Sequence, residues 1–353
     1  MRKVNRFLII SPYSTHKGEF HFQKLLTILH TKGIKSKMID SRAHITKFFE
    51  FNKFEKHKKF NDFLEEWNPD FILLDGYSEL VYPIIKKRIP FLFLVRGNVW
   101  DEEKWARETI CKSFKQRLAL RRKHRIFETC MENAFAIIAI SNFLKNIIKE
   151  KFPNKKIEVV YIDARIPEEW TLQRSMKLKH PCVGLLQGAG IWGKTKEMMI
   201  LPKIMEKMPH VNFYWAGDGI YKDKILPMLE NFTNFKWIGN LNYPGEVKEF
   251  LSEIDVYALF SGMDGLGQTV IEASLMEKPV IASKSGGIPE TMEDGKTGFL
   301  VESGDVQGWV DKISLVLNDS EISKNLGING RKFVSGKFNW NVISDKIIEI
   351  IEE

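Results

Sequence analysis

The sequence predicts an α/β protein built from two doubly wound domains, each a parallel sheet with helices on both faces. Short apolar runs typical of buried strands alternate with longer stretches of helical periodicity along all 353 residues. The alternation is interrupted once, by a polar, proline-containing stretch near 165–180, and then resumes. Because parallel strands need a crossover connection, usually a helix, this order predicts two parallel sheets joined by a hinge.

Each half of the chain contains six predicted strands. In the first half they cover 3–10, 34–40, 70–75, 90–95, 134–141 and 157–162. In the second half they cover 182–187, 211–217, 235–239, 255–260, 279–283 and 297–301. Helical spacing over 21–33, with Gly33 as C-terminal stop, is typical of the stretches between them. We expect one domain over 1–170 and another over 171–337, with a last helix, 338–353, that can pack back on the first.

Composition narrows the class of protein. The apolar content of 44% supports real cores, and no apolar run is long enough to span a bilayer. The start of the chain lacks the long apolar middle of a signal peptide, and three scattered cysteines indicate reduced thiols, so we expect a cytoplasmic protein. The net charge of +8 divides into +15 over 1–180 and −7 over 181–353. The basic half indicates an anionic partner.

The stretch GAGIWGKT, residues 188–195, matches the phosphate-binding pattern of P-loop proteins. The predicted strand 182–187 precedes it, and helical spacing over 196–208 follows it, which is the context that the pattern requires. A phosphate-binding turn is therefore expected here. One interpretation of this turn is an ATP- or GTP-using enzyme. Other motifs of the chain are needed to tell which ligand the turn binds.

A second loop follows the predicted strand 255–260. Gly265 and Gly267 allow the backbone to approach a ligand closely, and a helix is expected to begin near Gln268. A helix start offers unpaired N–H groups to phosphate or other electron-rich oxygens. Asp264 and Glu272 flank this loop, and carboxylates accept hydrogen bonds from sugar hydroxyls. The combination favours a sugar–phosphate ligand over a bare phosphate.

Over roughly 180–335 the chain resembles the retaining glycosyltransferases of family 4. The segment DGLGQTVIE occupies the place of that family's E-x7-E motif, and MEKPVIASKSGGIPETMEDGKTGFLV resembles the segment after it. The resemblance implies the GT-B fold, in which two Rossmann-like doubly wound domains face each other across a cleft. It also implies a retaining, metal-independent hexosyltransferase that takes its sugar from a nucleotide-diphosphate sugar, with UDP favoured by its frequency in the family.

The resemblance assigns roles residue by residue. Glu272 would hold the ribose hydroxyls, Asp264 would contact the donor sugar, and Lys194 would neutralise the diphosphate. Other donor-binding positions are Gly265, Leu266, Gly267, Gln268, Thr269, Gly188, Gly190, Gly193 and, in the first loop of the chain, Gly18. Gly217, Asp218 and Gly239 would border the base.

The chain departs from the family pattern at three places. Asp264 is one methylene shorter than the usual Glu. Ala189 and Gly188 stand where an Arg is usual, so backbone N–H groups would replace that side chain. After the predicted strand 90–95, RGNVW replaces the usual His, and Arg96 becomes a third candidate catalytic residue beside Lys194 and Asp264. No D-x-D triplet or metal-ligand motif occurs, and no metal or other cofactor is expected.

Residues 111–127 contain seven Lys or Arg and no acid, with Ile110, Phe114, Leu118 and Phe127 near one helical face. Either a solvated helix or a basic helix that touches an anionic membrane fits this pattern. We expect an anionic or lipid-linked acceptor, contact with the inner face of the cell membrane, and no nucleic acid. The remaining alternatives are the P-loop enzyme and a non-catalytic nucleotide-sugar-binding relative.

Overall fold

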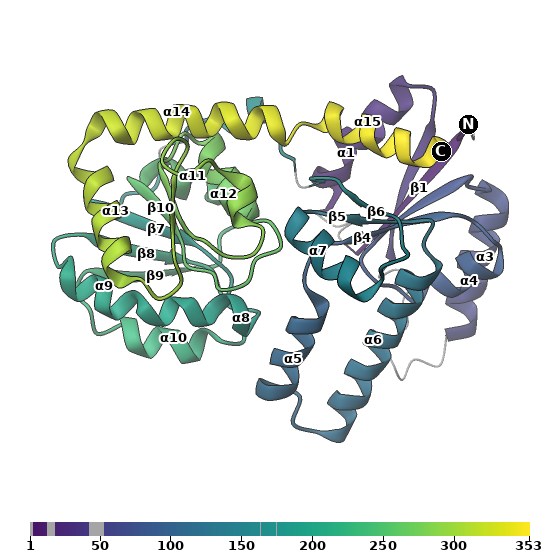
Figure 1. Cartoon of the computed structure of the whole chain (residues 1–353), viewed down its shortest axis with the longest axis horizontal. Coiled ribbons are helices and arrows are strands. Elements are labelled where there is room, and N and C mark those ends of the chain that lie inside the picture. The colour runs from purple at the N-terminus through teal and green to yellow at the C-terminus, as the bar shows by residue number, and fades with distance from the viewer. Residues whose placement is uncertain (1–2, 13–17, 42–52, 163, 174) are drawn as a thin grey trace. The chain divides into compact units, whose positions relative to one another are not determined.

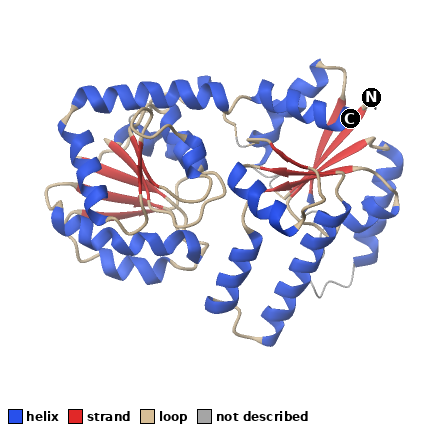
Figure 2. Cartoon of the chain, viewed as in Figure 1, coloured by secondary structure: helices blue, strands red, loops and turns tan. Residues whose placement is uncertain are grey.

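The computed structural model describes residues 3–12, 18–41, 53–162, 164–173 and 175–353. The chain divides into two compact units (Figure 1). Unit 1 comprises Met1–Arg96, Cys111–Ala164 and Trp340–Glu353, and unit 2 comprises Gly97–Ile110 and Arg165–Asn339. Each unit contains one six-stranded parallel sheet with helices on both faces (Figure 2), as the alternation of strands and helices predicts.

In unit 1 the strand order is β2-β1-β3-β4-β5-β6. The strands are β1 (Arg6–Ser11), β2 (Lys35–Asp40), β3 (Phe71–Asp75), β4 (Phe91–Val95), β5 (Ala136–Ala139) and β6 (Ile157–Val159). The helices are α1 (Gly18–Thr31), α3 (Lys53–Trp67), α4 (Val81–Lys86), α6 (Phe114–Asn133), α7 (Asn142–Lys151) and α15 (Trp340–Glu352). Every residue of β3, β4 and β5 is buried, because helices cover both faces of these central strands.

The last helix, α15, belongs to unit 1, although its sequence follows unit 2 directly. It packs against α1, with Ile347, Ile350 and Ile351 buried. Ion pairs from Asp345 to Lys32 and from Glu353 to Lys156 add to this contact. The last passage of the chain from unit 2 to unit 1 therefore lies between Asn339 and Trp340.

In unit 2 the strand order is β12-β11-β10-β7-β8-β9. The strands are β7 (Cys182–Leu186), β8 (Asn212–Ala216), β9 (Phe235–Gly239), β10 (Val256–Leu259), β11 (Val280–Ser283) and β12 (Phe299–Val301). The helices of eight residues or more are α5 (Val99–Thr109), α10 (Lys222–Leu229), α11 (Gly245–Glu253), α12 (Gln268–Leu275), α13 (Val306–Asn318) and α14 (Ser320–Lys337). The strand order reverses between β7 and β10, and in open parallel sheets ligands bind at such a reversal, beyond the carboxyl ends of the strands.

All twelve predicted strands are present, but two predicted helices differ from the structure. The helix expected over 196–208 is divided into a 3-10 turn, Lys196–Ile200, and α9 (Leu201–Lys207), after the one-turn helix α8 (Trp192–Thr195). Pro202 explains the division, because a proline has no N–H and is tolerated only in the first turn of a helix.

The basic helix also starts later than expected. Ser113 caps α6 and exchanges hydrogen bonds with Gln116 in a capping box, so the helix begins at Phe114. Ile110, which the sequence grouped with this helix, instead ends α5 in unit 2. Among the helices of the described residues, none is both long enough and apolar enough to cross a bilayer.

Candidate functional site

Lys194 and Asp264 meet where the strand order of unit 2 reverses. Lys194 lies in the turn after β7 and Asp264 in the loop after β10, and the Lys194 Nζ is 3.1 Å from the Asp264 Oδ1. The Ser261 hydroxyl donates to the other carboxylate oxygen at 3.3 Å. The side chains of Lys194 and Asp264 remain 30% and 16% exposed, so a ligand can still reach both charges.

The loop after Asp264 is held by a second glycine pair. Gly287 N–H donates to the Asp264 carbonyl at 2.8 Å, and a Cβ on Gly286 or Gly287 would lie 2.1 Å from the carbonyl oxygen of Asp264 or Gly265. These two glycines let the backbone segments 264–266 and 286–287 touch. They support the loop that carries Asp264.

Helix α12 begins directly after this loop. Its N-cap residue, Gly267, has a φ of +92° and no side chain that could cap the first N–H groups. The N–H groups of Gln268 and Thr269 therefore lie in the first turn of an eight-residue helix, which has an intrinsic preference for anions. The Thr269 hydroxyl accepts a hydrogen bond from Tyr257 of β10, and Leu266 is buried below the loop.

Glu272, one turn further along α12, has a partner that the sequence did not predict. Its Oε1 accepts from the Arg165 Nε at 3.1 Å and from a terminal guanidinium nitrogen of Arg165 at 2.8 Å. Both side chains are almost fully buried, at 5% and 7% exposure. Tyr243 lies beside the pair, and burial, followed by the charge of Glu272, raises the pKa of its hydroxyl. A charge pair so deeply buried fixes the direction of the Glu272 carboxylate.

The turn after β7 does not have the chemistry of a P-loop nucleotide site. In such a site the Thr hydroxyl binds Mg²⁺. Here Thr195 is fully buried, and its hydroxyl donates to the Ile191 carbonyl at 2.9 Å. The backbone N–H groups of Lys194 and Thr195 also donate to that carbonyl. The geometry leaves Lys194 as the charge that this turn offers to a ligand.

Backbone hydrogen bonds in glycine-containing turns connect the carboxyl ends of β7, β8 and β9. Gly217 N–H donates to the Gly239 carbonyl at 2.8 Å, and Ala189 N–H donates to the Asp218 carbonyl at 2.9 Å. The Asp218 carboxylate accepts from the N–H of the next residue, Gly219, at 2.7 Å. The three positions expected near the base thus form one connected edge, next to Gly188 and Gly190.

Gly219 provides a test of this edge. Its φ is +153°, and a Cβ there would lie 2.3 Å from the carbonyl carbon of Ala189. We expect Gly219→Ala to lower the free energy of unfolding of the protein by about 1–3 kcal/mol, since the turn must move. Urea unfolding measures this effect. Gly245→Ala, where a Cβ has no neighbour within 4 Å, is the matched control. Equal stability of both variants would contradict the prediction.

Helix α5 brings a further acid to this site. Burial raises the pKa of the Glu102 carboxyl, the neighbouring Lys194 ammonium lowers it, and the Asp264 carboxylate raises it again. Trp105, one turn later, lies against Gly193, where a Cβ would be 3.1 Å from the indole nitrogen. Lys196 stacks on the same ring at 4.6 Å. Sequence reasoning missed Glu102 because the segment 97–110 comes from the half of the chain assigned to the other domain.

Two predicted site residues belong to unit 1. Arg96 follows β4, and its Nε donates to the Asp75 Oδ1 at 2.6 Å. Asp75 also accepts from the Ser11 hydroxyl at 2.8 Å, and its side chain is 1% exposed. Arg96 is thus held at the carboxyl ends of β1, β3 and β4. Gly18 is the first residue of α1.

Comparison with known families finds a match for one segment of unit 2. Residues 198–333, which include Asp264, α12 and Glu272, match the model of the glycosyl transferases group 1 family. This segment is a group 1 glycosyl transferase domain. Among relatives of this domain is sulfoquinovosyl transferase SQD2 of Arabidopsis thaliana, which is 31% identical over 159 residues, or 44% of this chain and 30% of the relative. Across four such curated relatives, the chain spans 30% to 62% of the relative's length.

Solved structures extend the comparison to both units. Sucrose-phosphate synthase from Thermosynechococcus elongatus has a TM-score of 0.75 over 98% of both chains, at 17% identity. Anabaena HepE, crystallised with UDP and glucose, has a TM-score of 0.73 over 98% of this chain and 99% of its own, at 16% identity. At such identities the likeness concerns the fold. Units 1 and 2 together have the GT-B fold, as the sequence resemblance implied.

Proposed function

We propose that this protein is a retaining glycosyltransferase, as in family 4, that moves a hexosyl group from a nucleotide-diphosphate sugar to an acceptor hydroxyl. The observation that carries the proposal is the meeting of Lys194 with Asp264 beside the uncapped start of α12, at the strand-order reversal of unit 2. A cation, free backbone N–H groups and a carboxylate are the groups that a sugar diphosphate needs.

Lys194 acts on the leaving group. In the absence of donor its ammonium is balanced by Asp264, which holds it beside the loop. When the donor sugar binds, its diphosphate oxygens replace Asp264 as the partner of the Lys194 ammonium. The backbone N–H groups of Gln268 and Thr269 donate further hydrogen bonds to the diphosphate. Positive charge aimed at the diphosphate stabilises the negative charge that grows on it as the sugar leaves.

The carboxylates of Asp264 and Glu272 bind the hydroxyl groups of the donor. Asp264, released from Lys194, accepts hydrogen bonds from the hydroxyls of the transferred sugar. Glu272 accepts hydrogen bonds from the ribose hydroxyls, and Arg165 holds its Oε1 in place. Arg165 therefore acts as a positioning residue that orients the Glu272 carboxylate.

The reaction breaks the bond between the anomeric carbon and the diphosphate oxygen. The acceptor oxygen forms the new bond to the anomeric carbon from the same face, and its proton passes to the departing phosphate oxygen. Charge neutralisation by Lys194 and orientation by the loop then supply the catalysis, without a required metal. Arg96, held by Asp75, is proposed to contact the sugar or the acceptor.

Calorimetry with UDP, GDP, ADP and ATP, each with and without Mg²⁺, tests the ligand class. We expect one nucleoside diphosphate, UDP as first choice, and its sugar to bind without Mg²⁺. NMR of the product anomer then tests retention. Binding and hydrolysis of Mg²⁺–ATP, with no binding of nucleoside diphosphates, would overturn the proposal. Donor binding without transfer to any acceptor tried would instead indicate a non-catalytic relative.

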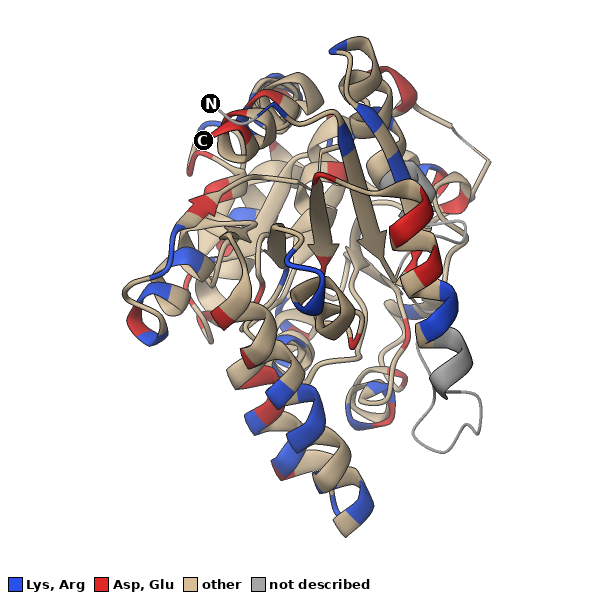
Figure 3. Cartoon of the chain, turned by 90° about the vertical axis from the view of Figure 1, so that its right-hand side faces the viewer, with Lys and Arg blue, Asp and Glu red and all other residues tan. Residues whose placement is uncertain are grey.

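We further propose that α6 brings the enzyme to the inner, cytoplasmic face of the cell membrane, where an anionic or lipid-linked acceptor lies. Lys and Arg residues recur along this helix (Figure 3). Phe114 and Leu118, one turn apart, are 78% and 43% exposed. An apolar pair surrounded by cations is what binding at an anionic lipid surface requires.

We expect the double variant Phe114→Ser/Leu118→Ser to bind phosphatidylserine vesicles about tenfold or more weakly, since burying one large apolar side chain contributes on the order of 1.5–3 kcal/mol. Vesicle sedimentation measures this. The control is Ile328→Ser on α14, where Ile328 is 45% exposed. Equal sedimentation of the double variant and the unmodified protein would contradict the proposal, as would equal binding to neutral vesicles.

A further inference from the structure

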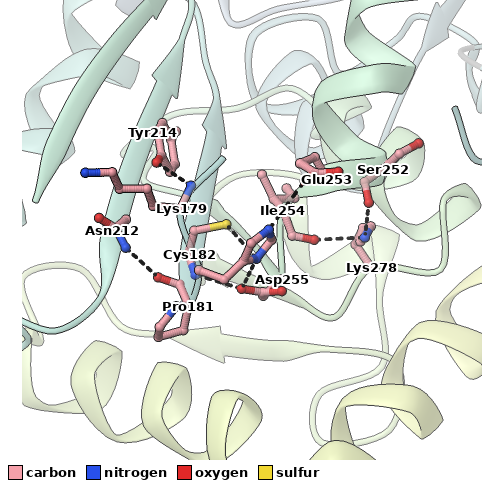
Figure 4. Close-up of polar contacts among 11 residues, drawn as sticks. Lys179, Pro181, Cys182, Asn212, Tyr214, Ser252, Glu253, Ile254, Asp255 and Lys278 are labelled. Atoms are coloured by element: carbon pink, nitrogen blue, oxygen red, sulfur yellow. Dashed lines mark hydrogen bonds and ion pairs between the residues drawn. The ribbon is translucent and has the colours of Figure 1, made fainter. Parts of the chain in front are cut away.

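A cluster of metal-binding side chains lies in unit 2 and has no part in the proposed transfer reaction. His180, Cys182 and Asp255 each offer one ligand atom, and these atoms lie within 4.8 Å of one another. The His180 Nδ1 is 2.8 Å from the Asp255 Oδ2 and 3.7 Å from the Cys182 Sγ. Figure 4 shows Cys182 beside Asp255.

The spacing of these atoms suits one small cation. Zinc binds His nitrogen and carboxylate oxygen at about 2.0–2.2 Å and Cys sulfur at about 2.3 Å, so tetrahedral ligand atoms lie roughly 3–4 Å apart. The nitrogen–sulfur separation of 3.7 Å lies within this range, and the nitrogen–oxygen separation of 2.8 Å lies just below it. A small rotation of the His180 ring or the Asp255 carboxylate would admit the ion. Mixed nitrogen, sulfur and oxygen ligands favour zinc over calcium or magnesium, which take oxygen alone.

The groups around the cluster are those of a prepared metal site. The other ring nitrogen of His180, Nε2, lies 3.4 Å from the Glu253 Oε1. A metal-bound His usually donates its second N–H to a carboxylate, which fixes the ring and its tautomer. The Cys182 N–H donates to the Asp255 Oδ2 at 2.7 Å, which holds that carboxylate against the start of β7. The nearby Lys278 ammonium donates hydrogen bonds to the carbonyls of Ser252 and Ile254.

We propose that His180 Nδ1, Cys182 Sγ and an Asp255 oxygen bind one Zn²⁺, with water in the fourth position and Glu253 orienting the imidazole. On binding, the Cys182 thiol proton leaves to solvent, and the metal forms the bond to the resulting thiolate. The Nδ1 atom gives up its proton as well, because it exchanges its hydrogen bond to Asp255 for the metal.

The position of the site indicates what the metal does. His180 and Cys182 lie at the amino end of β7, and Asp255 directly precedes β10. This is the opposite end of the sheet from Lys194 and Asp264, where the proposed donor binds. A cation here would hold together the amino ends of two neighbouring strands, β7 and β10, and the segment that leads into β7. We infer a structural role, in which the metal raises the stability of unit 2 and takes no part in transfer.

Cobalt provides the direct test, because a thiolate–Co²⁺ bond gives a charge-transfer absorption band in the near ultraviolet. Untagged protein, stripped with a chelator, is titrated with Co²⁺ and then with Zn²⁺. We expect one equivalent of Co²⁺ to produce the band, Zn²⁺ to abolish it, and Zn²⁺ to raise Tm. Cys182→Ser is expected to lose the band, whereas the matched control Cys111→Ser, at another buried cysteine, keeps it.

A second variant distinguishes a loss of metal binding from a folding defect of Cys182→Ser. His180 has a side chain that is 45% exposed, so His180→Gln is expected to fold normally and to bind Zn²⁺ at least about tenfold more weakly. A band that survives Cys182→Ser, the absence of a band in the unmodified protein, or equal Zn²⁺ affinity of His180→Gln would each overturn the proposal. None of these results depends on the nucleotide-sugar proposal.

Discussion

Replacing Lys194 with alanine is expected to lower kcat for sugar transfer on the order of a hundredfold to a thousandfold, the usual effect of removing one group that stabilises transition-state charge. The Lys194 ammonium lies 3.1 Å from the Asp264 carboxylate. We propose that it neutralises the charge of the departing diphosphate. Steady-state kinetics with a radiolabelled donor sugar measure the effect. Donor binding should weaken less than kcat falls, because negative charge on the diphosphate grows as the sugar leaves.

The matched control is Lys203→Ala. Lys203 is exposed on α9 of the same unit, so this variant removes a cation from the glycosyl transferase domain without touching the loop. Lys194→Arg keeps a positive charge and is expected to retain more activity than Lys194→Ala. If Lys194→Ala has a circular dichroism spectrum like that of the unmodified protein and a kcat within threefold of it, the role given to Lys194 is wrong.

Arg165→Met is expected to lower the free energy of unfolding by about 3–5 kcal/mol, because it leaves a buried carboxylate without its cation. The Arg165 and Glu272 side chains are only 7% and 5% exposed, so solvent cannot replace the missing partner. Urea unfolding measures the change. Arg165→Met/Glu272→Leu, which removes both charges, should recover most of the loss, since buried ion pairs add little over apolar packing.

An exposed pair in the same unit separates burial from charge. Lys284 and Glu302 form an ion pair at 2.7 Å with side chains 54% and 67% exposed, and Lys284→Met should hardly change stability. Arg165→Lys keeps a positive charge but cannot make the two-nitrogen contact with Glu272. It should make the free energy of donor binding less favourable by more than it lowers the free energy of unfolding. A double variant as unstable as Arg165→Met would contradict the view that the unpaired charge causes the loss.

The strands of both sheets could be predicted because buried parallel strands leave continuous apolar runs. The reversal of strand order between β7 and β10 then brings residue 194 near residue 264, and the flanking motifs were enough to anticipate that meeting. The same motifs did not show that Asp264 would be the direct partner of Lys194, since their contact depends on how two loops bend.

The partners that sequence reasoning missed are distant in the chain. Arg165 meets Glu272 across 107 residues, and no pattern in the polar stretch near 165–180 marks it as a buried cation. Glu102 lies beside Lys194 because α5 joins unit 2, although the strands on either side of α5 along the chain belong to unit 1. Asp255 completes the His180–Cys182 cluster from the position before β10, so the spacing of His and Cys alone gave no metal motif.

A crystal structure of the protein with an intact UDP-sugar is the sharpest test of the proposed donor site. We expect the diphosphate within hydrogen-bond distance of the Lys194 Nζ and of the first N–H groups of α12, with the ribose hydroxyls on Glu272. A donor bound elsewhere, with Lys194 still paired to Asp264 and Glu272 contacted only by Arg165, would contradict it.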